Sequence, residues 1–325
     1  MDPFELELRF SRLDDERFVE QLYRLVLRRD PDGDGRASAL TRLHRGRVSR
    51  ARLLEEMVSS AEFLRVRALD DAITAARADR AGKQRPRDLS APAGIDERAI
   101  EIRWTLSRYR GERYVLDFGS ANAEPAYLAA LLALGARSVT GVDIASAEIP
   151  GLELVQGDLR ALPFAEGSVD LAFCISTLEH VGADNSRYGT GDGADIGGGS
   201  AEALTELRRV LRRGGRLLLT VPCGAHEEHG WFVQLEPAEW LDLFKRSGFF
   251  VREHELYLHA AGGWRSASSE EVGALSYGES GKGAAAVLCV ELRAGDGPSL
   301  RERLHALRTR IDRAASFREG KPDDR

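Results

Sequence analysis

The chain has 325 residues, of which 43% are hydrophobic, so it can bury a full core and form one large domain with a smaller one. Its formal net charge of -6 excludes a general electrostatic attraction to nucleic acid, and no local basic patch takes its place. The N-terminus lacks the basic start and apolar centre of a signal peptide, and no stretch reaches the roughly 18 apolar residues that span a membrane, so we expect a cytoplasmic protein.

The three cysteines also indicate a cytoplasmic protein. Cys174, Cys223 and Cys289 lie in or beside apolar runs, their number is odd, and no two have CxxC spacing. These features predict buried thiols in a reducing environment rather than a set of disulfides.

Residues 1–80 are predicted to form a small helical accessory module. Apolar side chains recur there at helical spacing in two groups. The groups are Phe18, Leu22, Leu25 and Val26, and then Leu53, Leu54, Met57 and Val58. Proline and glycine in the segment 29–36 must interrupt the helices between them.

The acidic segment 29–36 resembles the start of a calcium-binding EF-hand loop. Asp30, Asp32, Asp34 and Gly35 fall at positions 1, 3, 5 and 6 of such a loop. Thr41, however, stands at position 12, where a bidentate glutamate is needed. We therefore predict a solvated turn here and no metal site.

The module as a whole also has a family pattern, which includes Leu22-Tyr23, Leu27-Arg28-Arg29-Asp30-Pro31-Asp32, Gly46 before a helix, and Ser60-Ala61-Glu62-Phe63. Over residues 15–67 it resembles a bacterial domain-of-unknown-function family that is often joined to glycan-modifying enzymes and surface proteins. Arg28 stands where that family usually has a glycine. The resemblance implies a role in association or substrate docking, and the alternative is a packing cap on the following domain.

The main domain is predicted over residues 96–295, after a polar linker at 81–95 that contains Gly and Pro. A helix at 96–110 leads into alternating elements. We expect strands at 114–118, 138–142, 152–156, 169–175, 216–221, 249–258 and 284–292, and helices at 125–134, 199–211 and 237–247. This alternation predicts an α/β fold with a doubly wound, Rossmann-like sheet of seven mostly parallel strands and an antiparallel hairpin at one edge.

Residues 296–325 are predicted to form a C-terminal helix and tail. Leu300, Leu304, Leu307 and Ile311 are at helical spacing within 298–317, and charges of both signs lie between them. The mixed charge favours packing or a homodimer contact over a membrane role.

Three carboxylates follow successive strands of the predicted sheet. Asp117 ends the first strand, Asp143 ends the second, and Asp158 follows the third. The carboxyl ends of parallel strands line the ligand crevice of such folds, and Asp143 has about the offset at which an acid accepts both ribose hydroxyls of an adenosine cofactor. We expect Asp158 to accept from the adenine amino group, and Asp117 with the amides near Gly119 to face a polar or charged tail.

The turn after the first strand argues against a dinucleotide. Its sequence, Gly119-Ser120-Ala121-Asn122-Ala123, lacks the further glycines that let a backbone approach pyrophosphate closely. A ligand without phosphates fits better, so an NAD-linked sugar oxidoreductase is disfavoured.

The complete series of motifs resembles the class I S-adenosylmethionine-dependent methyltransferases over residues 96–293. It comprises Val115-Leu-Asp-Phe-Gly-Ser120, Gly141-Val-Asp-Ile144, Gln156-Gly-Asp-Leu159, Leu162-Pro-Phe164, Ser168-Val-Asp-Leu171 and the segment 209–222. Ala121 and Ala123 stand where that family often has glycines. The resemblance implies S-adenosylmethionine as the cofactor, with a site made of Asp117, Phe118, Gly119, Ser120, Ala121, Asp143, Ile144, Asp158, Leu159, Ser176 and Leu178.

A narrower resemblance concerns the acceptor. Ser176-Thr-Leu-Glu-His-Val-Gly182, Arg187-Tyr-Gly189 and Val221-Pro-Cys-Gly224 are similar to a bacterial subgroup associated with polysaccharide and sugar-nucleotide genes. This resemblance implies a carbohydrate or glycan acceptor.

Four residues near the crevice mouth are candidates for catalysis. A hydroxyl acceptor must lose its proton as it attacks the methyl group, and a histidine within hydrogen-bond reach is an economical base. His180 follows the fourth strand, His226 and His229 lie in the loop after the fifth, and Glu179 could orient a histidine or bind the acceptor. The alternatives are that Glu179 and His180 begin a helix and that the other two histidines are solvated.

The glycine-rich segment 182–199 is predicted to be a polar lid over the crevice, with no metal required. Aromatic faces for sugar stacking could come from Trp231, Phe232, Trp240 and Trp264, although burial is the commoner fate of such residues.

The sequence therefore predicts an S-adenosylmethionine-dependent O-methyltransferase of a sugar, sugar nucleotide or glycan. A homodimer or a glycan-enzyme partner is expected to contact the N-terminal module or the C-terminal helix. One alternative is a methyltransferase of another small-molecule natural product. Another is a non-catalytic glycan- or protein-binding module that retains the fold, against which the binding carboxylates argue.

Overall fold

The computed structural model describes residue 10 and residues 12–188, 199–279, 281 and 283–295. The predicted C-terminal helix and tail, and residues 189–198 of the predicted lid, lie outside the described residues. None of the described helices is long and apolar enough to cross a bilayer.

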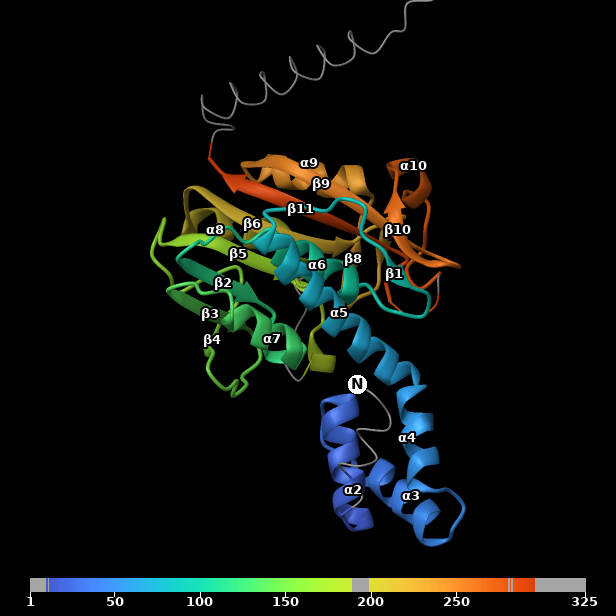
Figure 1. The fold of residues 1–325 in the computed structure, drawn as a ribbon. Coiled ribbons are helices and arrows are strands. Elements are labelled where there is room, and N and C mark those ends of the chain that lie inside the picture. The colour runs from blue at the N-terminus through green and yellow to red at the C-terminus, as the bar shows by residue number, and fades with distance from the viewer. Residues whose placement is uncertain (1–9, 11, 189–198, 280, 282, 296–325) are drawn as a thin grey trace, which may run out of the picture.

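A nine-stranded sheet forms the centre of the larger domain (Figure 1). Its spatial order is β1-β10-β9-β11-β6-β5-β2-β3-β4. The strands are β1 (Ala91–Pro92), β2 (Tyr114–Phe118), β3 (Ser138–Asp143), β4 (Glu153–Gln156), β5 (Val169–Ile175), β6 (Leu211–Pro222), β9 (Phe249–Ala260), β10 (Gly263–Ala267) and β11 (Ala286–Ala294). The run from β4 to β6 is parallel, and β11 is antiparallel to both β6 and β9.

The predicted fold class is confirmed, with a difference at one edge. The last two predicted strands do pair antiparallel, as β9 and β11, but β10 turns back onto β9 and β1 pairs with β10, so the sheet continues for two more strands. Gly262 precedes β10, Gly263 begins it and Pro92 ends β1, and both residue types normally indicate turns. Proline is tolerated at a sheet edge, where its missing N–H is not needed.

Helices cover both faces of the sheet (Figure 1). They are α5 (Ala61–Ala81), α6 (Arg98–Ser107) and α7 (Pro125–Leu132) on one face, with α8 (Gly199–Val210) and α9 (Pro237–Arg246) on the other, and a short α10 (Ser269–Val272). Leu218 of β6 lies in one buried cluster with Trp104 of α6, whereas its neighbour Leu219 lies in a second cluster with Trp240 of α9. Burial on both faces explains why these strands are near-continuous apolar runs.

The N-terminal helices form a second, smaller core. They are α2 (Asp15–Leu22), a π-helical turn (Tyr23–Leu27), α3 (Gly33–His44) and α4 (Arg50–Val58), and both predicted apolar groups meet in this core. Helix α5 connects it to the sheet (Figure 1): Phe63 packs against the small core, and Ile73 and Ala76 pack in the cluster on the sheet. In the segment predicted as a linker, Leu89 and Ile95 are buried, so this segment packs along the larger domain.

The acidic segment of the module caps a helix. Asp32 precedes α3, and its carboxylate accepts a hydrogen bond of 2.7 Å from the Gly35 N–H. Because α3 begins at Gly33, no twelve-residue EF-hand loop forms, and the predicted turn is confined to the preceding residues. Arg28 has φ 59, a conformation that favours glycine, which accounts for the glycine usual at this position in similar modules.

Candidate active site

A cavity of about 770 Å³ opens at the carboxyl ends of β2, β3, β4 and β5. This size is typical of small-molecule sites, which span about 300–1,000 Å³. Most of the predicted cofactor residues line it, namely Asp117, Phe118, Gly119, Asp143, Ile144, Asp158, Leu159 and Ser176. The expected convergence of three acids from three strands is therefore present in the structure.

The turn after β2 needs its glycine. Gly119 has φ 85, and a Cβ atom there would lie 2.5 Å from the Thr177 Oγ1 atom. Asp117 fixes the same turn, because its carboxylate accepts from the hydroxyls of Ser120, at 2.6 Å, and Tyr127. Burial raises the pKa of Asp117 to about 6, although both hydrogen bonds oppose the shift.

Asp143 is held at the rim of the cavity by two backbone amides. Its Oδ2 atom accepts from the Ala121 N–H and its Oδ1 atom from the Ala145 N–H, each at 2.9 Å. Each carboxylate oxygen has a second lone pair, so the group can still accept from a pair of neighbouring hydroxyls. This orientation suits the predicted contact with a ribose.

Asp158 differs from its predicted arrangement. Its two carboxylate oxygens accept from the Arg160 guanidinium at 2.7–3.1 Å, and this side-chain hydrogen bonding lowers the pKa of Asp158. Both residues line the cavity. An adenine amino group would therefore have to share Asp158 with Arg160 or displace it, which the spacing of acids along the sequence did not indicate.

Three predicted cofactor residues do not line the cavity. Ser120 is buried against Asp117, Ala121 contributes the N–H that orients Asp143, and Leu178 lies in the core between the sheet and α8. These three residues therefore lie behind the residues that line the cavity.

His180 is positioned in the cavity by a backbone carbonyl. Its Nδ1 atom lies 2.8 Å from the Trp231 carbonyl oxygen. A carbonyl only accepts, so Nδ1 must carry the proton, and the neutral ring has its lone pair on Nε2. The ring also stacks on Trp231 at 5.2 Å and meets the edge of Tyr188 at 5.4 Å. These contacts fix both the orientation and the tautomer that a general base needs.

Glu179 lies beside this histidine, with its Oε1 atom 3.9 Å from His180 Nε2. The side chain is only 3% exposed, and its Oε2 atom has no hydrogen-bond partner among the described residues. Burial raises the pKa of Glu179 well above its usual range. The structure therefore places Glu179 and His180 together on the cavity wall, as a short 3-10 turn rather than the start of a long helix.

The other two candidate histidines lie elsewhere. His226 is half exposed and pairs with Glu239 at 3.0 Å, and His229 pairs with Glu227 at 2.9 Å and stacks on Phe232. Neither lines the cavity; they flank β7 (Glu227–Glu228), which pairs antiparallel with β8 (Val233–Gln234). Of the three candidate histidines, His180 is therefore the one that lines the cavity.

Of the four aromatic candidates, two are core residues. The indole N–H groups of Trp240 and Trp264 donate to the carbonyls of Pro222 and Ile95, and both rings are buried. Trp231 and Phe232 line the cavity.

Helix α6 and the segment before it supply wall residues that sequence reasoning missed. Glu97 and Arg98 line the cavity, and Glu101 lies directly behind them, fully buried. The Ser176 hydroxyl donates to Glu101 at 2.7 Å, and Ser176 itself has φ 42, a strained conformation for a residue other than glycine. The available sign was a charged residue between the apolar residues Ile100 and Ile102.

Comparison with known families identifies the domain. Residues 116–219 match the family described as "Methyltransferase domain". These residues form a methyltransferase domain. Residues 4–66 match a family described as "Domain of unknown function (DUF4214)", which assigns the N-terminal module no activity. The predicted enzyme class is confirmed at the level of this methyltransferase domain.

Similar proteins cover the chain in parts. A "Probable S-adenosylmethionine-dependent methyltransferase" of Mycolicibacterium smegmatis is 28% identical over 165 residues, which is 46% of this chain and 57% of that protein. An uncharacterized 37.1 kDa transposon protein of Streptomyces fradiae is 39% identical over 74 residues, 23% of this chain and 17% of that protein. The chain thus spans less than two thirds of these curated relatives.

Among solved structures, a 1,6-didemethyltoxoflavin-N1-methyltransferase of Burkholderia thailandensis with bound S-adenosylhomocysteine has 16% identity and a TM-score of 0.39, covering 85% of this chain and 91% of that one. The assignment of the methyltransferase domain rests on the family match together with the strand order and cavity described above.

Proposed function

We propose that the protein is a cytoplasmic S-adenosylmethionine-dependent methyltransferase that methylates a hydroxyl of a sugar, sugar nucleotide or glycan. The observation that carries the methyl-transfer part is the cavity of the methyltransferase domain, with Asp143 oriented at its rim by two backbone amides. The acceptor part rests on the cavity wall around His180.

The described residues fit the cofactor. Asp143 could accept from the ribose hydroxyls, and Ile144 and Leu159 would offer apolar surface to an adenine ring. The turn at Gly119, which also lines the cavity, would present backbone to the ligand. When bound, the cofactor supplies a methyl group activated on a sulfonium.

The chain's own task is then to hold the acceptor in line and to take its proton. His180 Nε2 has the lone pair for that proton, because Nδ1 is committed to the Trp231 carbonyl. Glu179 lines the cavity beside this atom, with its Oε1 atom 3.9 Å from His180 Nε2, and can accept a hydrogen bond from the acceptor. Carboxyl oxygens beside aromatic rings also suit a polyhydroxyl acceptor, since carboxyls bind hydroxyls and rings pack on sugar faces.

Calorimetric titration with S-adenosylmethionine and S-adenosylhomocysteine tests the cofactor. We expect Asp143→Ala to weaken both by about tenfold to a hundredfold, because hydrogen bonds to a charged group are lost. Asp242→Ala is the matched control, since Asp242 lies exposed on α9 away from the cavity. If the unaltered protein binds neither compound, the proposal fails.

Mass spectrometry tests the acceptor part. Candidate sugar nucleotides and lipid-linked glycans incubated with protein and cofactor should include one that gains the mass of one methylene. On that acceptor we expect His180→Ala to lower kcat by about 10²–10⁴ without changing S-adenosylhomocysteine binding. His226→Ala, outside the cavity, should leave kcat unchanged; equal losses in both variants would contradict the assigned base.

A further inference from the structure

The acceptor side of the cavity contains an excess of buried carboxyl groups. Glu97, Glu101 and Glu179 each have an Oε2 atom that is buried and lacks a hydrogen-bond partner within the described part of the chain. Glu179 and Glu97 line the cavity, and Glu101 lies behind them. Together they are called the acidic wall below.

The cations around the acidic wall do not balance it. Arg98 is the guanidinium that reaches it, and its NH1 atom lies 4.0 Å from Glu101 Oε2, longer than a hydrogen bond. Burial raises the pKa of each of the three carboxyls, and their mutual repulsion adds to the shift for Glu97 and Glu179. A cationic ligand would offset both the burial of these carboxyls and their mutual repulsion, because it would supply positive charge and hydrogen-bond donors at once.

The rings beside the acidic wall favour the same kind of ligand. Trp231, Tyr277 and Phe232 line this part of the cavity, with Tyr277 4.5 Å from Phe232 and 6.4 Å from Trp231 between ring centroids. Aromatic faces attract cations through their electron-rich surfaces. Burial and the nearby charges of Glu97 and Glu179 also raise the pKa of Tyr277 to about 12, so its ring stays neutral.

The geometry favours an organic cation over a metal ion. Among the described residues, no group of three or more His, Cys, Asp or Glu side chains is arranged to hold a metal. An ammonium group has three donors that point in different directions and can serve separated carboxyl oxygens.

We propose that the acceptor carries a protonated amine, bound by Glu179 and Glu97 against the aromatic rings, next to the hydroxyl that His180 deprotonates. The acceptor class is therefore an amino sugar rather than a neutral or acidic one. This inference rests on the proposed function, and it adds the charge of the substrate.

The test uses amino sugars with the amine at each ring position, and for each one its N-acetyl counterpart, which has the same ring but no charge. Binding is measured by calorimetry to the full chain saturated with S-adenosylhomocysteine, at a pH at which the amine is protonated. We expect at least one amino sugar to bind about tenfold tighter than its N-acetyl counterpart. Equal binding of every pair, or no binding of any amino sugar, would overturn the inference.

Three variants locate the preference. In Glu179→Gln and Glu97→Gln we expect the preference for the amine to fall by about tenfold, with S-adenosylhomocysteine binding unchanged. Glu270→Gln, an exposed glutamate on α10, should keep the preference. If the wall variants instead weaken S-adenosylhomocysteine and leave the preference intact, the acidic wall serves the cofactor and the inference is wrong. Failure of S-adenosylhomocysteine to bind the unaltered protein would refute the proposed function itself.

Discussion

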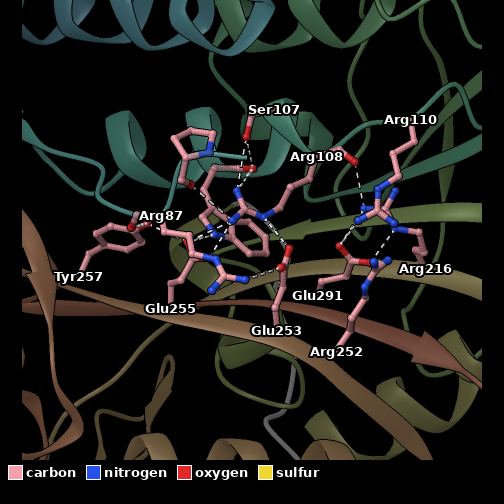
Figure 2. A network of polar contacts seen from close by, with 12 residues as sticks. Arg87, Ser107, Arg108, Arg110, Arg216, Arg252, Glu253, Glu255, Tyr257 and Glu291 are labelled. Carbon is pink, nitrogen blue, oxygen red and sulfur yellow. Dashed lines mark hydrogen bonds and ion pairs between the residues drawn. The ribbon is translucent and has the colours of Figure 1, made fainter. Parts of the chain in front are cut away.

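Two groups of buried or partly buried glutamates in the same domain have opposite surroundings. Glu253, Glu255 and Glu291, on β9 and β11, lie in the network of Figure 2, where arginine side chains point at each carboxylate. Glu97, Glu101 and Glu179, the acidic wall, have buried oxygens that no described residue pairs. Residue type and depth are similar in the two groups, so the difference lies in the partners.

Glu291 illustrates the paired group. It is fully buried and receives hydrogen bonds from Arg110 at 2.6 Å, from Arg216 at 3.0 Å and from Arg252 at 3.0 Å (Figure 2). Burial alone would raise the pKa of Glu291, but the charges and hydrogen bonds of these arginines lower it to about 2. Its role is to join β11 to β6, β9 and the end of α6.

Arg108 extends the same network to the other two glutamates. It is fully buried, contacts Glu253 at 3.2 Å and Glu255 at 2.8 Å, and lies over the Trp104 ring at 3.9 Å. Glu255 also accepts from the Trp104 indole and the Tyr257 hydroxyl. The glutamates of this network all face arginines, whereas each glutamate of the acidic wall has one buried oxygen without a partner among the described residues. Perturbed, unpaired groups in a cavity are typical of functional sites.

Removing Glu291 should have the largest effect on stability. We expect Glu291→Gln to lower the free energy of unfolding at neutral pH by about 3–5 kcal/mol, because three guanidinium groups lose their shared buried counter-charge. Urea unfolding followed by circular dichroism measures the change. A loss below about 1 kcal/mol would show that the network is not what holds these strands.

The corresponding change in the acidic wall should have the opposite sign. We expect Glu179→Gln to leave the free energy of unfolding at pH 8 unchanged or to raise it by about 1 kcal/mol. The substitution replaces a buried carboxyl, which has no charged partner at hydrogen-bond distance, by a neutral amide of similar size. The same urea experiment compares the two variants. If Glu179→Gln destabilises as much as Glu291→Gln, the distinction between a structural and a ligand-binding group fails.

The sequence predicted what depends on local pattern. The apolar strands, the turn at Gly119 and the acids at the strand ends were found because a buried parallel strand and its following turn are encoded within a few residues. Asp117 and Asp143 accordingly lie in the cavity as expected. Asp158 also lies there, but its pairing with Arg160 depends on side-chain conformations that spacing does not specify.

What the sequence could not predict depends on contacts between distant segments. His226 and His229 were expected at the crevice, but neither lines the cavity, and they pair instead with Glu239 and Glu227. Glu97, Arg98 and Glu101 precede β2, and only the packing of α6 beside β5 and β6 brings them to the site. Wall residues contributed in this way follow no motif.

The two groups of glutamates should also differ in how their protonation changes stability with pH. The folded pKa of Glu97 is raised, by burial and by Glu101, from its usual 4.5 to about 7. The folded protein then binds more protons than the unfolded chain between about pH 4.5 and 7, so this group makes stability fall as pH rises through that window. Glu291, with a folded pKa of about 2, makes stability fall as pH decreases from 4.5 toward 2.

In the unaltered protein the free energy of unfolding should decline between pH 4.5 and 7, and we expect Glu97→Gln to make this decline shallower. From pH 4.5 to pH 8 the variant should lose less stability than the unaltered protein, by an amount on the order of 2 kcal/mol. Part of the decline should remain, because burial also raises the pKa of Glu101 next to it. Urea unfolding at a series of pH values measures the slope, with Glu270→Gln as the exposed control. A slope identical to that of the unaltered protein would mean that Glu97 is already paired in solution, which would place it with Glu291 rather than in a ligand-binding wall.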